Sequence, residues 1–156
     1  MIQLIDKVCT EGGATHVAAE RLRDMDFSGV NQRLIGKGHE EHDVDQLREQ
    51  AIRFLSLAAT TDINLAPSHQ VDEYWHELIL NTQLYEGIGN VLGRFIHHVP
   101  SENPDDPELR IAYINTRTAL QSVFGEVDHK YWPEKSGVSG CTGELCSAAC
   151  RRKRIS

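Results

Sequence analysis

The stretch PSHQVDEYWHELILNTQLYEGIGNVLGRFIHHVP, residues 67–100, decides how this chain of 156 residues folds. Ser68 carries a hydroxyl suited to cap the first turn of a helix, and the proline before it directs the chain into that turn. Apolar residues then recur at helical spacing, and two glycines, Gly87 and Gly89, are expected to loosen the helix before Pro100 ends the stretch. The predicted inward face comprises Val71, Trp75, Leu78, Ile79 and Thr82.

The chain before this stretch also has apolar residues at helical spacing. Residues 1–25 are predicted to form two helices separated by the double glycine at 12–13. Residues 26–43 form a polar, glycine-containing stretch with no predicted helix, and Gly36 and Gly38 in it indicate a loop. Asp43 is the expected N-cap of the next helix, because Gln46 three residues later completes a capping-box pattern.

After the stretch, Asp105 or Asp106 is expected to start a last helix that ends at Gly125. An aromatic turn around Trp132 is predicted to fold back on the body. Because no segment alternates convincingly like a strand, the sequence predicts an all-α protein. Its domain, residues 1–135, is expected to be a compact bundle of about five helices.

The last part of the chain, residues 136–156, has a different composition. It is small and polar, it contains Cys141, Cys146 and Cys150, and it ends in the basic run RRKRIS. We therefore predict a flexible tail. The cysteine spacing does not match a structural zinc motif, so a second metal site, a redox site and a set of free thiols are all open interpretations.

Charge and hydropathy narrow the possible partners and compartment. The net charge is −7, and without the four basic residues of the C-terminus it becomes −11, from 12 basic and 23 acidic residues. An acidic body disfavours nucleic acid, except through the basic C-terminus, and leaves a protein partner open. The chain has neither an apolar run that could span a membrane nor a signal-peptide pattern, so we expect a cytoplasmic protein.

A candidate metal site follows from residue spacing. Asp72 and His76 are four residues apart, which on a helix places both side chains on one face. A chain that turns back after the glycines would bring His97 or His98 to the same place. Two imidazoles and one carboxylate suit zinc, or ferrous iron, with an open coordination position. His129 is a further candidate ligand.

Each of these residues also has a purely structural interpretation. Asp72 lies in a first helical turn, where a carboxylate interacts favourably with the helix dipole. His76 could bond to a backbone carbonyl inside the core, and the adjacent histidines could cap a helix end. Aromatic residues at helical spacing are usually core residues, although they can line a pocket. The pocket-lining candidates are Trp75, Tyr85 and Trp132.

The string VDEYWHELIL…FIHHVP, together with Phe124-Gly125 and Trp132-Pro133, is similar to the signature of the glycine-rich-domain-containing-protein-like family. The resemblance covers about residues 48–133. One departure is Ile88-Gly89, where members of that family often carry an aromatic residue and a cysteine. The resemblance implies no settled activity, but it does imply that the aspartate and histidines belong to the family signature, and this favours a site.

The sequence therefore predicts a protein that binds a divalent metal, zinc or iron, through Asp72, His76 and His97 or His98. Whether it is an enzyme stays open at this point. One alternative is a noncatalytic protein-interaction module in which the histidines and Trp75 hold the helices together. Another is a redox or metal-handling protein that uses the C-terminal cysteines.

Overall fold

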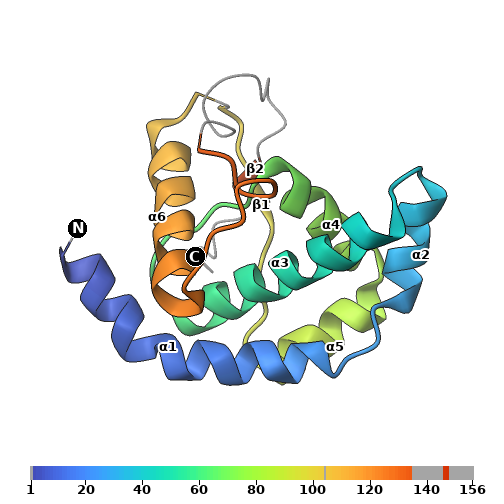
Figure 1. The fold of residues 1–156 in the computed structure, drawn as a ribbon, viewed down its shortest axis with the longest axis horizontal. Coiled ribbons are helices and arrows are strands. Elements are labelled where there is room, and N and C mark those ends of the chain that lie inside the picture. The colour runs from blue at the N-terminus through green and yellow to red at the C-terminus, as the bar shows by residue number, and fades with distance from the viewer. Residues whose placement is uncertain (1, 104, 135–145, 148–156) are drawn as a thin grey trace.

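The computed structural model describes residues 2–103, 105–134 and 146–147 (Figure 1). These residues form six helices and one short antiparallel strand pair, which confirms the predicted all-α class. The elements are α1 (Ile2–Arg23), α2 (Ser28–Gly36), α3 (Glu41–Thr60), α4 (His69–Leu80), α5 (Thr82–Leu92), β1 (Val99–Pro100), α6 (Pro107–Phe124) and β2 (Cys146–Ser147). The predicted tail, residues 136–156, lies outside the described residues except for β2. Among the helices of the described part, none has the length and apolar character of a membrane span.

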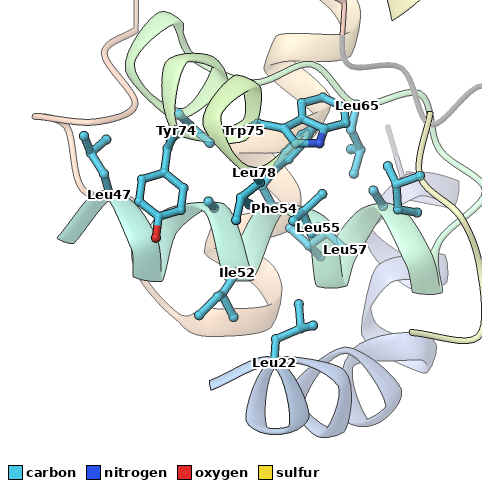
Figure 2. Close-up of a cluster of buried hydrophobic side chains, with 14 of the residues drawn as sticks. Leu22, Leu47, Ile52, Phe54, Leu55, Leu57, Leu65, Tyr74, Trp75 and Leu78 are labelled. Carbon is cyan, nitrogen blue, oxygen red and sulfur yellow. The ribbon is translucent and has the colours of Figure 1, made fainter. Parts of the chain in front are cut away.

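The central helix, α3, contacts α1, α2, α4 and α6, and it crosses the middle of the molecule in Figure 1. Its apolar residues are buried on more than one side, as expected for a helix surrounded by others. In Figure 2, Ile52 points toward Leu22 of α1, while Phe54 lies against Trp75 of α4 with ring centroids 5.3 Å apart. Each such fully buried apolar side chain stabilises the fold by about 1.5–3 kcal/mol.

Three predicted helix boundaries are confirmed by their capping contacts. The Ser68 hydroxyl accepts a hydrogen bond from the Val71 amide at 3.2 Å, so α4 starts where the sequence indicated. At the start of α6, the Asp106 carboxylate accepts from the Glu108 amide at 2.9 Å. Gly125 ends that helix in the left-handed region, with φ of 77°.

Two features of the N-terminal part differ from the predictions. The first helix, α1, runs through the double glycine at 12–13 without a break, because its packing against α3 and α6 outweighs the low helix propensity of glycine. The polar stretch over residues 26–43, for which no helix was predicted, contains the helix α2, and the loop indicated by its glycines is found at residues 37–40. Val30 and Leu34, four residues apart, bury one face of this helix completely, which explains why a mostly polar segment is helical.

Asp43 is not the N-cap of α3, which starts at Glu41 after an N-cap residue without a side-chain hydrogen bond. Asp43 instead accepts hydrogen bonds from the Lys130 ammonium and, at 3.1 Å, from the Tyr131 hydroxyl. The bond from Lys130, followed by that from Tyr131, holds the pKa of Asp43 below its ordinary value. Through these two hydrogen bonds, Asp43 joins α3 to the aromatic turn that contains Lys130 and Tyr131.

The turn after α6 folds back on the body, as predicted. Trp132 is fully buried and donates its indole N–H to the Gln50 side chain of α3 at 2.8 Å. The Tyr113 hydroxyl donates to the Pro133 carbonyl at 2.6 Å, which closes the turn against α6.

Gly87 and Gly89 were expected to loosen the helix, but α5 runs through both without a break, and the two glycines permit close packing. A Cβ at Gly87 would lie 3.3 Å from the Met25 side chain, and one at Gly89 would lie 3.6 Å from the Arg94 carbonyl oxygen. The helix ends at Gly93, which has φ of 71° and turns the chain toward β1. The close packing at Gly89 and the left-handed turn at Gly93 together direct residues 94–98 back across α4.

Candidate metal centre

Asp72 is the buried member of the candidate site. It lies in the first turn of α4 and is only 3% exposed. One carboxylate oxygen, Oδ1, lies 2.9 Å from Nε2 of His98, and the other, Oδ2, lies 3.4 Å from Nδ1 of His76. Within the described residues, its ion-pair partners are these two histidines and include no lysine or arginine.

His76 lies one helical turn further along α4, as the spacing predicted. Its Nδ1 atom is 2.7 Å from the main-chain oxygen of Asp72, and its side chain is 49% exposed. The centroid of its ring is 4.4 Å from that of His98. His76 therefore forms the solvent-facing side of the cluster, while the other two residues lie beneath it.

His98 reaches the site on the extended segment between α5 and β1. The Tyr85 hydroxyl donates to the Ile96 carbonyl two residues earlier, and the Trp75 indole N–H donates to the Tyr85 oxygen at 3.0 Å. The Trp75 ring also packs edge-on against the His98 ring at 4.6 Å. These buried aromatic residues hold the segment in the position from which the imidazole reaches Asp72.

Asp72, His76 and His98 each offer one ligand atom, and the three atoms lie within 4.8 Å of one another. A group of this kind could hold a metal ion, so the expectation that α4 and the histidine pair meet is confirmed. Of the pair, His98 joins the cluster. His97 is exposed, and its ring packs against Phe95 at 4.8 Å. Exposure alternates along this segment, with Phe95 and His97 exposed and Ile96 and His98 turned inward, as expected where successive side chains point to opposite sides.

The proposed pocket-lining aromatics are all buried in the core. Trp75 and Tyr85 support the segment that carries His98, whereas Trp132 packs against Phe54, at 6.2 Å between ring centroids. His129 lies 3.2 Å from the Arg117 guanidinium and does not belong to the cluster.

The predicted cysteine site falls largely outside the described residues. This applies to Cys141 and Cys150. The backbone of Cys146 is described, and it lies in β2 opposite Pro100 of β1.

A second buried acid on α4, Glu77, was not predicted from the sequence. Glu77 accepts hydrogen bonds from Lys37, the residue directly after α2, and, at 3.0 Å, from Arg33 of α2. The Lys37 bond, supported by that from Arg33, holds the pKa of Glu77 below its ordinary value. The cationic pair at i and i+4 would have been a signal, but it falls in the stretch for which no helix was predicted.

Comparison with known proteins gives a family but no annotated relative. A family model described as UCP032817-like matches residues 19–119, which is more than half of the chain and includes all three residues of the cluster. No curated protein and no solved structure matches.

Proposed function

The chain therefore belongs to the UCP032817-like family, whose description assigns no activity, and we propose from its site that it binds a divalent metal ion. The ligands are Asp72, His76 and His98, and the ion is zinc or ferrous iron. The observation that carries this proposal is the convergence of their three ligand atoms within 4.8 Å.

The donor set supports this choice of metals. Imidazole nitrogen and carboxylate oxygen bind zinc and ferrous iron at about 2.0–2.2 Å, which places the ligand atoms about 3–3.5 Å from one another. The carboxylate already lies 2.9 Å from Nε2 of His98. Nδ1 of His76 lies 3.4 Å from the carboxylate but is also 2.7 Å from the main-chain oxygen of Asp72, so the His76 ring has to turn away from that oxygen to offer a nitrogen lone pair to an ion.

The charge balance also supports a cation. A buried carboxylate is unfavourable unless a positive charge or several hydrogen bonds compensate it. The partners of Asp72 are imidazoles, which are uncharged in the form that binds a metal. A divalent ion among the three residues supplies the missing charge.

Three protein ligands would leave a coordination position for another group. A water molecule bound there by zinc has a lowered pKa and can act as a nucleophile, and ferrous iron can bind dioxygen at such a position. This chemistry is the basis for an enzymatic role, which forms part of the proposal for this site.

A noncatalytic role is the second candidate. Its support is the direct hydrogen bond between Asp72 and His98, which joins α4 to the segment before β1 without an ion. In that case the motif would stabilise a module that binds another protein.

We also propose, from the sequence motif, kinship with the glycine-rich-domain-containing-protein-like family and a cytoplasmic location.

Elemental analysis of the full chain, purified without an affinity tag, tests the proposal. We expect about one equivalent of zinc or iron in the wild type and in His97→Ala, and loss of the metal in His98→Ala. His97→Ala is a matched control, because it removes the neighbouring imidazole without touching the cluster. A wild-type protein that is metal-free and takes up neither ion on reconstitution would contradict the proposal and favour the structural role.

A further inference from the structure

Tyr85 connects the two parts of the chain that build the candidate metal centre. The helix α4 carries two of the three ligands, whereas His98 lies on the segment after α5, outside any helix or strand. Tyr85 of α5 is 5% exposed, and its hydroxyl bonds to Trp75 of α4 on one side and to Ile96 on the other. One buried hydroxyl therefore joins the helix of two ligands to the segment of the third.

The main chain of residues 95–98 depends on this hydroxyl. These residues have no helix or strand to pair their peptide groups, so other partners have to hold them in place. Within the described residues, the Ile96 carbonyl is the one main-chain group of residues 95–98 that hydrogen-bonds to another part of the chain. Ile96 is 1% exposed, so its carbonyl would be left buried and unpaired without the phenol.

The indole N–H of Trp75 sets the direction of the Tyr85 hydroxyl. It donates to the phenol oxygen at 3.0 Å, which leaves the phenol proton for the Ile96 carbonyl. Hydrogen bonds in such a chain polarise and strengthen one another. The Trp75 ring also lies against the His98 imidazole, at 4.6 Å between ring centroids. The chain of bonds thus fixes the backbone two residues before the ligand, and its first member contacts the ligand's ring.

We propose that Tyr85 is a positioning residue of the metal centre, whose hydroxyl holds His98 where it completes the ligand set and thereby sets the affinity for the ion. This inference rests on the proposed metal-binding function. Without the hydroxyl, residues 95–98 gain conformational freedom, and binding an ion has to order them again. Part of the binding free energy is then used for ordering, so the ion is bound more weakly.

Cobalt(II) titration of tyrosine variants of the full chain, under reducing conditions, tests this. Tetrahedral cobalt absorbs in the visible region, and its bands weaken when water replaces a protein ligand and the coordination number rises. Tyr85→Phe removes the hydroxyl and keeps the ring. We expect it to bind cobalt about 10–100-fold more weakly than the wild type, as is typical when an outer partner of a ligand is lost.

Tyr113→Phe is the matched control. Tyr113 is 3% exposed, and its hydroxyl also donates to a main-chain carbonyl, that of Pro133, in a turn that carries none of the three ligands. Denaturant unfolding of the apo proteins should show a similar loss of stability in both variants, because each loses one bond from a buried hydroxyl. Cobalt affinity of Tyr113→Phe should stay within about twofold of the wild type, because the bond it loses does not act on a ligand.

A second variant covers the case in which Tyr85→Phe does not fold. Trp75→Phe keeps Tyr85 but removes the N–H that directs its hydroxyl, and it should also bind cobalt more weakly than the wild type and Tyr113→Phe.

The outcomes separate this inference from the function on which it rests. Wild-type cobalt affinity in Tyr85→Phe would overturn the role of Tyr85 and leave the metal site intact. An equal loss of affinity in Tyr85→Phe and Tyr113→Phe would also overturn it, because the effect would then come from a general loosening of the fold. A wild type without visible cobalt bands would contradict the metal-binding function itself.

Discussion

Two carboxylates on α4, Asp72 and Glu77, are equally buried, at 3% exposure each, but have different partners. Glu77 is bonded to Lys37 and Arg33, which are permanent cations supplied by the C-terminal end of α2. Asp72 is bonded to two imidazoles. Five residues apart on one helix, the two acids point to different sides, one toward a structural contact and one toward the candidate centre.

The comparison teaches that burial alone does not identify a functional acid. A buried charge needs compensation, and for Glu77 the fold provides it in full. For Asp72 the neighbouring groups are ligands that bind a cation when they are uncharged. The positive charge beside Asp72 can therefore come from a bound cation, whereas the charge beside Glu77 comes from the protein's own side chains. This difference distinguishes a candidate metal-binding site from a structural ion pair.

The largest effect is expected for Asp72→Asn, which should weaken zinc binding at least about 100-fold. Zinc at 100 times its wild-type dissociation constant should raise the unfolding free energy of the wild type by about 2.7 kcal/mol, and that of the variant by about 0.4 kcal/mol or less. Denaturant unfolding with and without a chelator measures both. If zinc stabilised the wild type and Asp72→Asn equally, Asp72 would not be a metal ligand, and the proposed difference in role between Asp72 and Glu77 would be wrong.

Glu77→Gln is the reciprocal experiment. It should lower the stability of the fold, by less than the zinc effect above, and should leave zinc binding unchanged. We expect the unfolding free energy to fall by about 1–2 kcal/mol, because the charge-assisted bonds from α2 are weakened. Zinc affinity should stay within about twofold of the wild type, because Glu77 is not a ligand; the same unfolding series and a zinc titration test this. A large loss of zinc binding would mean that the acids do not have separate roles.

The smallest effect is expected at a third acid, Glu49, which Arg23 and Arg53 contact closer to solvent. Burial raises its pKa, but the hydrogen bonds from Arg23 and then Arg53 outweigh this and hold the pKa below its ordinary value. A lowered pKa stabilises the fold at neutral pH, and this stabilisation is lost as the pH falls through the acid range.

Glu49→Gln should therefore lower the unfolding free energy by less than about 1 kcal/mol at pH 7 and flatten its decline below about pH 5. Unfolding curves at pH 7, 5 and 3 measure this. If the unfolding free energy of Glu49→Gln fell as steeply between pH 5 and pH 3 as that of the wild type, the ion pairs of Glu49 would not contribute to the pH dependence of stability.

Features set by local chemistry could be predicted from the sequence. The Ser68 cap, the helical spacing of Asp72 and His76, and the left-handed glycine at 125 depend on residues within one or two turns of each other. The aromatic turn was also predictable, since Trp132 is a large apolar residue in a polar segment and its burial is strongly favoured.

Features that depend on distant residues could not be predicted. His98 was distinguishable from His97 only once the segment before β1 was known to be extended and held by Tyr85. The bonds from α2 to Glu77 span 40 or more residues, and the local pattern around Lys37 indicates a loop. In both cases tertiary packing overrides what the neighbouring residues favour.

The contact between Trp75 and His98 gives the molecule a built-in optical signal. The chain has two tryptophans, and Trp75 has an imidazole of the cluster against its ring. An imidazole close to an excited indole quenches its emission, and coordination of the imidazole by a metal ion alters that quenching. Trp132→Phe would leave Trp75 as the sole tryptophan, so that tryptophan fluorescence would report on the side of the cluster that His98 occupies.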